Sequence, residues 1–276
     1  ALTRCVARSN LGDVMHLLRR SPRVLAVIPA RLASSRLPRK PLFQLAGRPL
    51  IEWVWRRVAG MDGFAAVVVA TDAPEVLEVA RGFGAMAELT STVHPSGTDR
   101  IAEMVEKPLY RGFDVVVNVQ GDEPFVTAEQ VHGALAALQT DGRGAGTVAA
   151  PIRSVAEWRD PAVVKVVRDD AGAALLFSRA PVPHCRDGEP DFASGLFLRH
   201  VGIYAYTRET LLRWVDLPEH PLERLERLEQ LRPLAAGIPI GVETVARATG
   251  GVDTAEDAAW ADRLLRELEL ENAFER

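Results

Sequence analysis

Four cationic side chains fall within ten residues of one another in the segment 27–42, VIPARLASSRLPRKPL. The segment follows an apolar run that predicts a strand, and its cations are Arg31, Arg36, Arg39 and Lys40. Such groups in one loop can surround a polyanion, because their donors match phosphate oxygens. Ser34 and Ser35 are small enough to let the backbone approach a ligand. A solvated loop is the alternative, and a Walker loop is excluded because the GxxxxGKS or GxxxxGKT pattern is absent.

Two aspartates follow predicted strands or short glycine turns and could hold a metal ion. Asp122 lies in NVQGDEP, at the end of an apolar strand, and Asp253 lies in GVDT. Mg²⁺ takes oxygen ligands, often only one or two carboxylates, and water and substrate phosphates complete its shell. Alternatively, Asp122 is a turn acid and Asp253 only begins the last helix. The cationic loop, which points to the same edge, favours the metal site for Asp122.

The segment HPSGTDR, residues 94–100, predicts a loop that enters a helix. Ser96 and Gly97 would present a hydroxyl and free N–H groups at the helix N-terminus, which suits an anion or the polar edge of a ring. The simpler interpretation is that Ser96 only caps the helix.

Strand and helix patterns alternate along most of the chain, which predicts an α/β fold: a mostly parallel, Rossmann-like sheet with helices on both faces. In such sheets, ligands bind outside the carboxyl ends of the strands. The cationic loop, Asp72, Asp122 and Asp253 should therefore converge at one edge. Strand-like runs occupy 24–28, 65–70, 114–120, 147–151 and 240–245, and helical patterns occupy 49–59, 74–83, 97–107, 127–139, 207–215, 222–236 and the segment after Asp253.

Between about 160 and 206 the rhythm changes, because three strand-like runs follow one another without clear helices. This predicts a small embedded antiparallel subdomain that could form the contact of a homodimer. Thr254 and Asp257 predict the N-cap and capping box of the last helix. We expect a single domain over 24–276, preceded by a leader, 1–23, to which we assign no function.

The composition is that of a soluble globular protein. Of 276 residues, 47% are apolar, and 33 Lys and Arg face 37 Asp and Glu, a net charge of −4. This charge gives no bulk attraction to nucleic acid or acidic membranes. No run reaches the roughly 20 apolar residues of a membrane span. Cys5 and Cys185 form no metal-type spacing or disulfide framework, so we expect a cytoplasmic setting.

Taken together, the motifs resemble those of the 3-deoxy-manno-octulosonate (Kdo) cytidylyltransferases, the CMP-Kdo synthetases. The resemblance implies a nucleotidyltransferase fold and the Mg²⁺-dependent reaction of CTP with Kdo, which gives CMP-Kdo for lipopolysaccharide synthesis and releases diphosphate. It extends from about Val24 to Leu268 and includes VIPARLASSRLPRKPL, VVVATD, HPSGTDRIAEMVE, VVNVQGDEP, VVKVV, LLFSRAPVP, FLRHVGIYAY, PLERLERLEQLRPL and GVDTAED.

The resemblance also implies roles for individual residues. Arg31, Lys40 and Asp122 would carry catalysis, and Asp122 and Asp253 would hold Mg²⁺. The residues expected to bind CTP are Arg31, Ser34, Ser35, Arg36, Lys40, Asp72, Ser96 and Gly97. The residues expected on the sugar side are Gln120, Lys165, Arg179, His200 and Glu229. Arg179, Arg199 and His200 are the cationic or polar partners available to the Kdo carboxylate.

Two positions depart from the pattern of some relatives, which have an acidic residue at Val93 and a basic residue near Ser91. These positions concern base or sugar contacts. One rival function is a cytidylyltransferase for another acidic keto-sugar, such as N-acylneuraminate. A rival of another class is a catalytically silent nucleotide-binding protein, which predicts the loss of a residue such as Lys40, Asp122 or Asp253, yet all three are present. A dinucleotide oxidoreductase is excluded, because GxGxxG does not follow the first strand.

Overall fold

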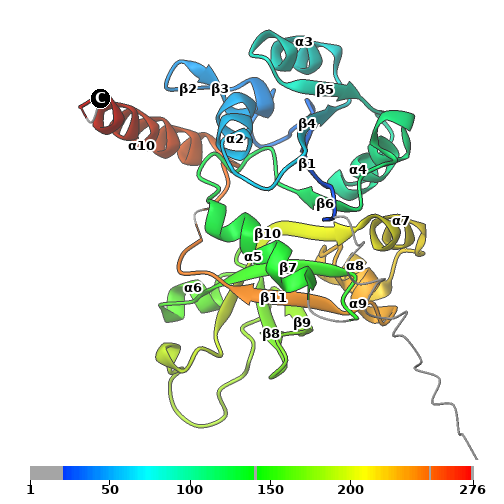
Figure 1. Ribbon diagram of the computed structural model, residues 1–276. Coiled ribbons are helices and arrows are strands. Elements are labelled where there is room, and N and C mark those ends of the chain that lie inside the picture. The colour runs from blue at the N-terminus through cyan, green and yellow to red at the C-terminus, as the bar shows by residue number, and fades with distance from the viewer. Residues whose placement is uncertain (1–20, 140–141, 249, 275–276) are drawn as a thin grey trace, which may run out of the picture.

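The computed structural model describes residues 21–139, 142–248 and 250–274 (Figure 1). Most of the leader expected over 1–23 lies outside these residues. Within them, a nine-stranded sheet has the order β11-β7-β10-β6-β1-β4-β5, with β8 paired to β10 and β9 to β8. Neighbours are parallel except that β10 runs antiparallel to β6, β7 and β8, and β8 to β9. The predicted mostly parallel α/β sheet with a small antiparallel addition is confirmed.

The strands of the main sheet are β1 (Val24–Ala30), β4 (Ala66–Thr71), β5 (Met86–Leu89), β6 (Val115–Asn118), β7 (Ala145–Pro151), β8 (Lys165–Arg168), β9 (Ala174–Ser178), β10 (Leu198–Thr207) and β11 (Ile240–Thr244); β2 (Gln44–Leu45) and β3 (Arg48–Pro49) form a separate hairpin. The helices are α2 (Leu50–Ala59), α3 (Pro74–Gly82), α4 (Gly97–Glu106), α5 (Ala128–Gln139), α6 (Val155–Arg159), α7 (Arg208–Asp216), α8 (Pro221–Glu226), α9 (Leu231–Ala235) and α10 (Ala255–Phe274), with short 3₁₀ turns η1 (Lys40–Leu42), η2 (Pro108–Tyr110) and η3 (Phe192–Ser194).

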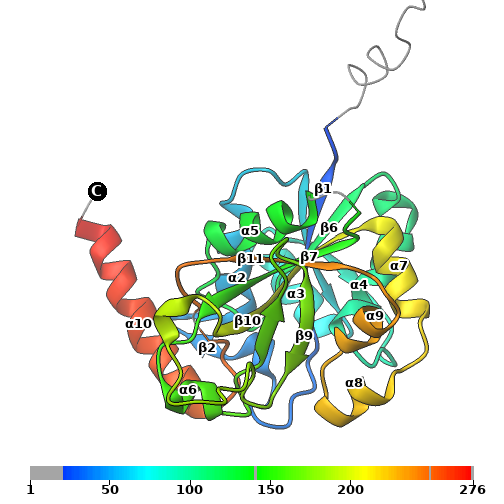
Figure 2. The same cartoon turned by 90° about the horizontal axis from the view of Figure 1, so that it is seen from below.

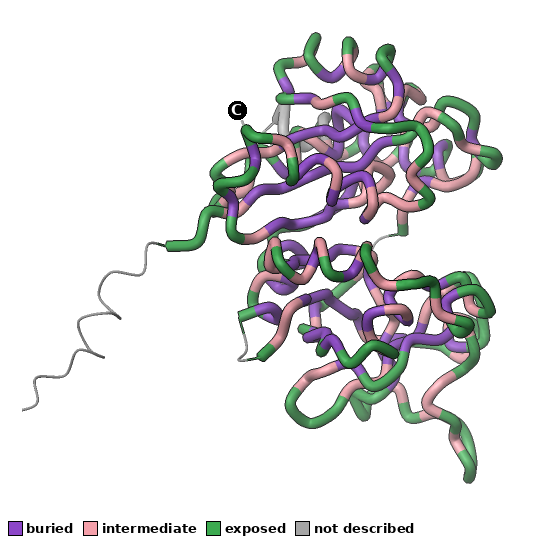
Figure 3. Tube along the Cα trace, turned by 90° about the vertical axis from the view of Figure 1, so that its right-hand side faces the viewer, coloured by how far each residue is buried: buried purple, intermediate pink, exposed green. Residues whose placement is uncertain are grey.

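Strand β1 is apolar at nearly every position because helices cover both faces of the sheet. Ile28 belongs to the core beneath α2, α3, α5 and α10, whereas Val27 belongs to the core beneath α4, α7 and α9. Seen from below, α10 and the pair α7 and α9 lie on opposite sides of the molecule (Figure 2). Buried residues concentrate along the strands (Figure 3). No helix among the described residues is long and apolar enough to cross a membrane.

Two of the expected elements are arranged differently in the structure. The single helix expected over 222–236 is two helices, α8 and α9, because Arg227 adopts a left-handed conformation (φ 52°) that ends α8. The run expected to close the antiparallel subdomain is part of β10, whose second half, Tyr204–Thr207, pairs with β6 in the middle of the main sheet. The antiparallel addition therefore consists of the β8–β9 hairpin and the loop after it.

The start of α10 follows the predicted capping pattern. The Asp257 N–H donates to Thr254 Oγ1 at 3.1 Å, and the Thr254 N–H donates to Asp257 Oδ2 at 2.8 Å. The same Oδ2 accepts from the Asp253 N–H at 3.0 Å. The capping box therefore also fixes the backbone of Asp253.

Helix α5 lies unusually close to β7 and β11 because glycines face it. A Cβ added at Gly146 would lie 2.3 Å from the Ala134 carbonyl oxygen and 2.5 Å from the Leu138 nitrogen, which are backbone atoms of α5. A Cβ at Gly241 would lie 2.3 Å from the Ala137 carbonyl oxygen. The distance between helix and sheet is thus set by the absence of side chains.

We expect Gly146→Ala to lower the free energy of unfolding by about 2 kcal/mol or more, since overpacking a close contact forces the helix away from the sheet. Urea denaturation measures this change. Gly82→Ala, in a helix with no heavy atom within 4 Å of the added Cβ, is the matched control and should leave stability unchanged or slightly raised. Equal stability of the two variants would contradict the close packing of α5.

Candidate functional site

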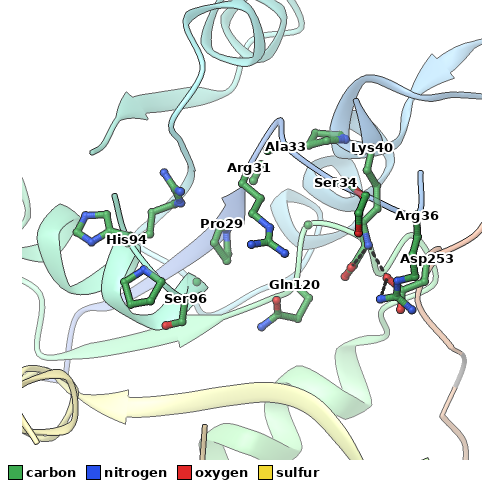
Figure 4. Close-up of a pocket in the computed structure, with 18 residues that line it drawn as sticks. Pro29, Arg31, Ala33, Ser34, Arg36, Lys40, His94, Ser96, Gln120 and Asp253 are labelled. Atoms are coloured by element: carbon green, nitrogen blue, oxygen red, sulfur yellow. Dashed lines mark hydrogen bonds and ion pairs between the residues drawn. The ribbon is translucent and has the colours of Figure 1, made fainter. Parts of the chain in front are cut away.

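A pocket of about 480 Å³ opens at the carboxyl ends of β1 and β6 (Figure 4). Its walls come from three segments, 29–41, 94–100 and 120–122, together with Asp253. The convergence expected from a parallel sheet is therefore present. The residues predicted from the sequence that line it are Arg31, Ser34, Ser35, Arg36, Lys40, Ser96, Gly97, Gln120, Asp122 and Asp253.

One end of the pocket is a cluster of two cations and two carboxylates. Lys40 Nζ lies 2.5 Å from Asp122 Oδ2 and 2.7 Å from Asp253 Oδ1, and Arg36 contacts the same Asp253 oxygen at 2.9 Å. Burial acts to lower the pKa of the Lys40 ammonium, but the two carboxylates outweigh it and hold that pKa above its usual value. Lys40 therefore stays charged and holds together two acids that are 131 positions apart in sequence.

The position of Asp122 depends on the glycine before it. A Cβ added at Gly121 would lie 2.6 Å from the Pro29 carbonyl oxygen, so only glycine lets this turn pack against the end of β1. The Val252 N–H donates to the Asp122 carbonyl oxygen at 2.8 Å. This bond brings the segment that carries Asp253 beside the Asp122 turn, which explains why the two carboxylates meet.

Glu123 is a further acidic residue of this cluster that the sequence analysis did not select. Burial raises the pKa of the Glu123 carboxyl to about 8, the charge of Asp122 adds to the shift, and the charge of Arg199 opposes it. Glu123 is thus mainly protonated at neutral pH, while its neighbour Asp122 carries the ion pair. Its place in the GDEP turn was the available sequence signal, but local sequence does not reveal burial.

Arg31 lies between the two ends of the pocket, above Gln120 (Figure 4). Among the described residues, its guanidinium has no hydrogen bond or ion pair, whereas Arg36 and Lys40 are both paired. An uncompensated guanidinium in a concave site is suited to an anionic ligand. Of the other loop residues, Ser34 accepts a 3.4 Å hydrogen bond from the Leu37 N–H.

The other end of the pocket is formed by the N-terminus of α4. Ser96 Oγ accepts from the Asp99 N–H at 3.2 Å and donates to Asp99 Oδ2 at 2.5 Å, so Ser96 is the N-cap of the helix. Ser96 and Gly97 also line the pocket. Ser96 therefore caps the helix and also faces the pocket, so the capping and ligand-binding interpretations of residues 94–100 are compatible.

Asp72 is not among the lining residues; instead it braces two walls of the pocket. Its Oδ1 accepts from the Leu32 N–H at 3.1 Å, and its Oδ2 accepts from Arg100 at 3.0 Å. Arg100, only 3% exposed, also donates to Thr90 Oγ1 at 2.5 Å and to the Ser91 carbonyl at 3.3 Å. Both oxygens of Asp72 therefore hold the loops, and a direct contact of Asp72 with CTP stays a prediction.

The loop at 91–94 is held by a second acid. Glu103 Oε2 lies 2.5 Å from His94 Nε2 and accepts from the Ser91 N–H at 2.8 Å. Burial acts to raise the pKa of Glu103, but the Ser91 N–H and His94 outweigh it and hold that pKa below its usual value. His94 lines the pocket, whereas Val93 is 81% exposed. Ser91 and Val93 therefore lie on a loop that Glu103 fixes.

Lys165, predicted on the sugar side, is fully buried. Its ammonium donates to the carbonyl oxygens of Asp160, Val163 and Arg179 at 2.9, 2.6 and 2.7 Å. Burial lowers the pKa of Lys165. All three donors are used, so Lys165 ties β8 to the chain that follows β9, and its direct contact with a sugar stays a prediction.

The other residues predicted on the sugar side have distinct surroundings. Gln120 lines the pocket and donates to the Gly202 carbonyl at 3.4 Å. Arg179 donates through Nε to the Glu226 carbonyl at 2.8 Å and through a terminal nitrogen to the Pro161 carbonyl at 2.9 Å. Their roles as sugar ligands stay predictions.

His200 and Glu229 are buried groups with strongly shifted pKa values. Burial lowers the pKa of the His200 imidazole to about 3, so the ring is neutral, and its Nε2 lies 3.0 Å from Thr147 Oγ1. Burial raises the pKa of Glu229 to about 7, although Thr98 and Ser96 favour its charged form. Glu229 is therefore close to the N-terminus of α4. Direct contact of either residue with a sugar stays a prediction.

Comparison of the sequence with known proteins finds cytidylyltransferases both among protein families and among individual proteins. A family model described as cytidylyltransferase matches residues 25–240. A 3-deoxy-manno-octulosonate cytidylyltransferase of Gemmatimonas aurantiaca is 50% identical over 87% of this chain and 93% of its own. One of Syntrophotalea carbinolica is 44% identical over 89% of this chain and 99% of its own.

Solved structures resemble the chain as well. A CMP:2-keto-3-deoxy-manno-octonic acid synthetase complexed with CTP has a TM-score of 0.83 and 40% identity over 89% of this chain and 99% of its own. A 4-diphosphocytidyl-2C-methyl-D-erythritol synthase of Anaerococcus prevotii has a TM-score of 0.60 at 13% identity over 89% of this chain and 99% of its own, a likeness of fold alone.

We expect Asp72→Ala to lower the free energy of unfolding by roughly 3 kcal/mol, because the buried Arg100 would keep its charge without its carboxylate partner. Urea denaturation measures this loss. Glu75→Ala is the control, since it breaks the exposed Arg39–Glu75 ion pair and should cost less than about 1 kcal/mol. A loss of similar size in both variants would show that the Asp72 brace is no stronger than a surface ion pair.

Proposed function

Because the chain belongs to the 3-deoxy-manno-octulosonate cytidylyltransferase family, we propose that it transfers CMP from CTP to Kdo and releases diphosphate. The observation that carries this proposal is the cluster of Lys40, Asp122 and Asp253 in one pocket with Arg31, which has no ion pair with any described residue. The sequence relatives and the CTP-bound structural relative support the same reaction.

The triphosphate of CTP is assigned to the part of the pocket lined by Arg31, Arg36 and Lys40. Arg31 offers donors that no other described residue uses, and Arg36 and Lys40 add two charges that line the same pocket. In the reaction, the anomeric hydroxyl of Kdo attacks the α-phosphorus in line with the departing diphosphate. The oxygen–phosphorus bond to the sugar forms, the bond to diphosphate breaks, and the hydroxyl proton is lost to solvent. Fixed cations stabilise the charge that builds on the diphosphate.

Positioning by the pocket walls provides much of the rate enhancement in a displacement of this kind. The Asp72 brace fixes the loop that carries Arg31 relative to α4, and the Gly121 turn fixes Asp122 against β1. No side chain needs to form a covalent bond with the nucleotide. The neutral carboxyl of Glu123 adds no second negative charge beside Asp122.

We propose Asp122 and Asp253 as the ligands of Mg²⁺. Both carboxylates contact one ammonium, so they are close enough to share a cation. Among the described residues no group of three or more His, Cys, Asp or Glu is placed to hold a metal ion, so water and phosphate oxygens would complete the shell. Bound Mg²⁺ would neutralise phosphate charge and lower the pKa of the attacking hydroxyl. Lys40 would then exchange its carboxylate partners for phosphate oxygens.

The sugar is assigned to the side of the pocket that faces β10. Gln120 lines the pocket there, and Arg179, His200 and Glu229 are the further residues proposed to contact Kdo. Supply of CMP-Kdo to lipopolysaccharide synthesis and a cytoplasmic location stay predictions. A homodimer stays a prediction as well, which the molar mass in solution tests. The exposed Leu175 and Leu196, in β9 and the loop before β10, are apolar surface that a partner could cover.

Purified protein supplied with CTP, Mg²⁺ and a candidate sugar should release diphosphate with Kdo and not with N-acetylneuraminate. The physical reason is that the sugar contacts, and not the triphosphate loop, discriminate between acidic keto-sugars. A coupled diphosphate assay measures the release, and CTP alone is the control. Equal or faster turnover with N-acetylneuraminate would assign the chain to the rival substrate. CTP binding without turnover of either sugar would favour the catalytically silent alternative.

Asp122→Asn and Asp253→Asn should each lower kcat by roughly a hundredfold or more, because each removes a charge from one metal site. The double variant should lose much less than the product of the two losses, since the residues act as a unit. Raising Mg²⁺ should partly rescue the single variants, and titration with Mn²⁺ should show weaker metal binding without any turnover.

Glu78→Gln, an exposed acid on α3 outside the pocket, is the matched control and should keep both kcat and Mn²⁺ affinity. If the losses of the two aspartate variants multiply, or if Asp253→Asn lowers only thermal stability, Asp253 is a helix-starting residue and the shared metal site is wrong.

A further inference from the structure

A second pocket, of about 390 Å³, lies at the carboxyl ends of the parallel strands β7 and β11. We call it the arginine pocket, because three guanidinium groups and a single carboxylate line it and its other lining residues are small or apolar. It is lined by Ala150, Pro151, Arg153, Glu157, Arg199, Ala246, Arg247 and Ala248.

Arg199 forms the inner part of the arginine pocket. A terminal nitrogen of its guanidinium donates to Glu157 Oε1 at 3.0 Å. Its Nε is buried and has no hydrogen-bond partner among the described residues. A buried donor left without a partner is energetically unfavourable. An anion that entered the pocket would meet the positive charge of this guanidinium, which a single carboxylate, that of Glu157, compensates.

Arg153 and Arg247 form the rim, and their backbones are held in place. The Arg247 carbonyl accepts from Gln130 Nε2 at 3.2 Å, and the Arg153 N–H donates to Glu157 Oε2 at 3.1 Å. The Arg247 guanidinium has no partner among the described residues, and Arg153 donates only one long bond, 3.3 Å, to the Ala246 carbonyl. Both rim cations therefore keep most of their donors for a ligand.

The arginine pocket and the first pocket lie along one edge of the sheet. Strands β6 and β7 both run antiparallel to β10, so their carboxyl ends point the same way. Ala246 and Arg247 line the arginine pocket, and Asp253, a few residues further along the chain, lines the first pocket. The charge of Arg199 also acts on Glu123, next to Asp122.

The sugar substrate is not the expected occupant. Neighbouring residues of a strand point to opposite faces, and Arg199 contacts Glu157 while His200 contacts Thr147 and packs against Phe177. In the sequence analysis, Arg199 and His200 are named together as partners for the Kdo carboxylate. The structure separates them, and only Arg199 lines the arginine pocket.

We propose that Arg153, Arg199 and Arg247 form a second binding site for a small phosphate-class anion. Paired guanidinium forks match the geometry of phosphate oxygens and give strong charge-assisted hydrogen bonds. The anion is either inorganic diphosphate or free inorganic phosphate. If the anion is diphosphate, its supply by the reaction rests on the proposed function. The existence of the anion site does not depend on that function.

The test is calorimetric titration of diphosphate, and separately of phosphate, into wild-type protein saturated with CTP in the absence of Kdo. CTP occupies the first pocket, so the heat reports the arginine pocket. Arg153→Gln with Arg247→Gln should weaken binding by at least about tenfold, because two charge-assisted contacts are lost. Arg159→Gln, an exposed arginine of α6 outside the pocket, is the matched control and should bind as the wild type does.

A parallel titration of Lys40→Ala separates this proposal from the proposed function, because Lys40 lines only the first pocket. The variant should bind the anion as the wild type does, even if the protein proves unable to transfer CMP. Tighter binding of diphosphate than of phosphate would identify diphosphate, the reaction product, as the anion that occupies the arginine pocket. Equal binding of the two would identify free phosphate as that anion.

Three results would overturn the arginine pocket as an anion site. They are the absence of binding to the CTP-loaded wild type, equal affinity of the Arg153→Gln/Arg247→Gln variant and the wild type, and loss of binding in Lys40→Ala. Displacement of bound diphosphate by Kdo would also overturn it, since the pocket would then belong to the sugar.

Discussion

The ammonium of Lys40 between Asp122 and Asp253 is the interaction around which the pocket is organised. Two carboxylates that contact the same ammonium would repel each other in its absence. The Lys40 cation between them instead links the segment after β6 to the segment before α10. The hydrogen bond from Val252 to the Asp122 carbonyl reinforces the link. The site thus contains its own substitute for a bound cation, and replacement of the ammonium by a divalent ion requires no new approach of the two acids.

The backbone around this cluster is held by groups that do not face a ligand. Asp72 fixes the loop after β1 to α4, Glu103 fixes the loop that carries His94, and Lys165 fixes the turn before β8. Each is a charged side chain, half-buried at Asp72 and Glu103 and buried at Lys165, that is compensated by directed hydrogen bonds. Because these braces hold the loops, an exposed side chain of the site such as Arg31 does not have to hold its own loop in place.

The layered sheet and the composition of the first pocket were predictable from the sequence, because both depend on local patterns. The apolar stripe and the Ser96 cap predict the helix over 97–107, and α4 spans Gly97–Glu106. The turn at Arg227 was missed because the repeat LERLEQL continues the helical period through it. The edge strand β5 was missed because it has only four residues and is partly exposed.

The buried charges were harder to predict, since their partners are distant in sequence. Nothing near Asp72 indicates Arg100, and the three arginines of the arginine pocket come from segments about 46 to 48 positions apart. Lys165 is an instructive case, because its position in the apolar run VVKVV already indicated burial. A family motif shows that a residue matters, but only the packing shows whether it contacts a ligand or supports a residue that does.

Strand β10 has a consequence for how the chain assembles. Strands β6 and β7 follow one another in sequence but do not pair, because β10, which begins more than fifty positions after β7 starts, lies between them. Until residues 198–207 have left the ribosome, the nascent sheet has two unpaired apolar edges in its middle, and such edges are templates for pairing with other chains. Closure of the sheet depends on contacts between distant segments, which form slowly. A polypeptide truncated before β10 would therefore present a surface for chaperones or for aggregation, and not a smaller working enzyme.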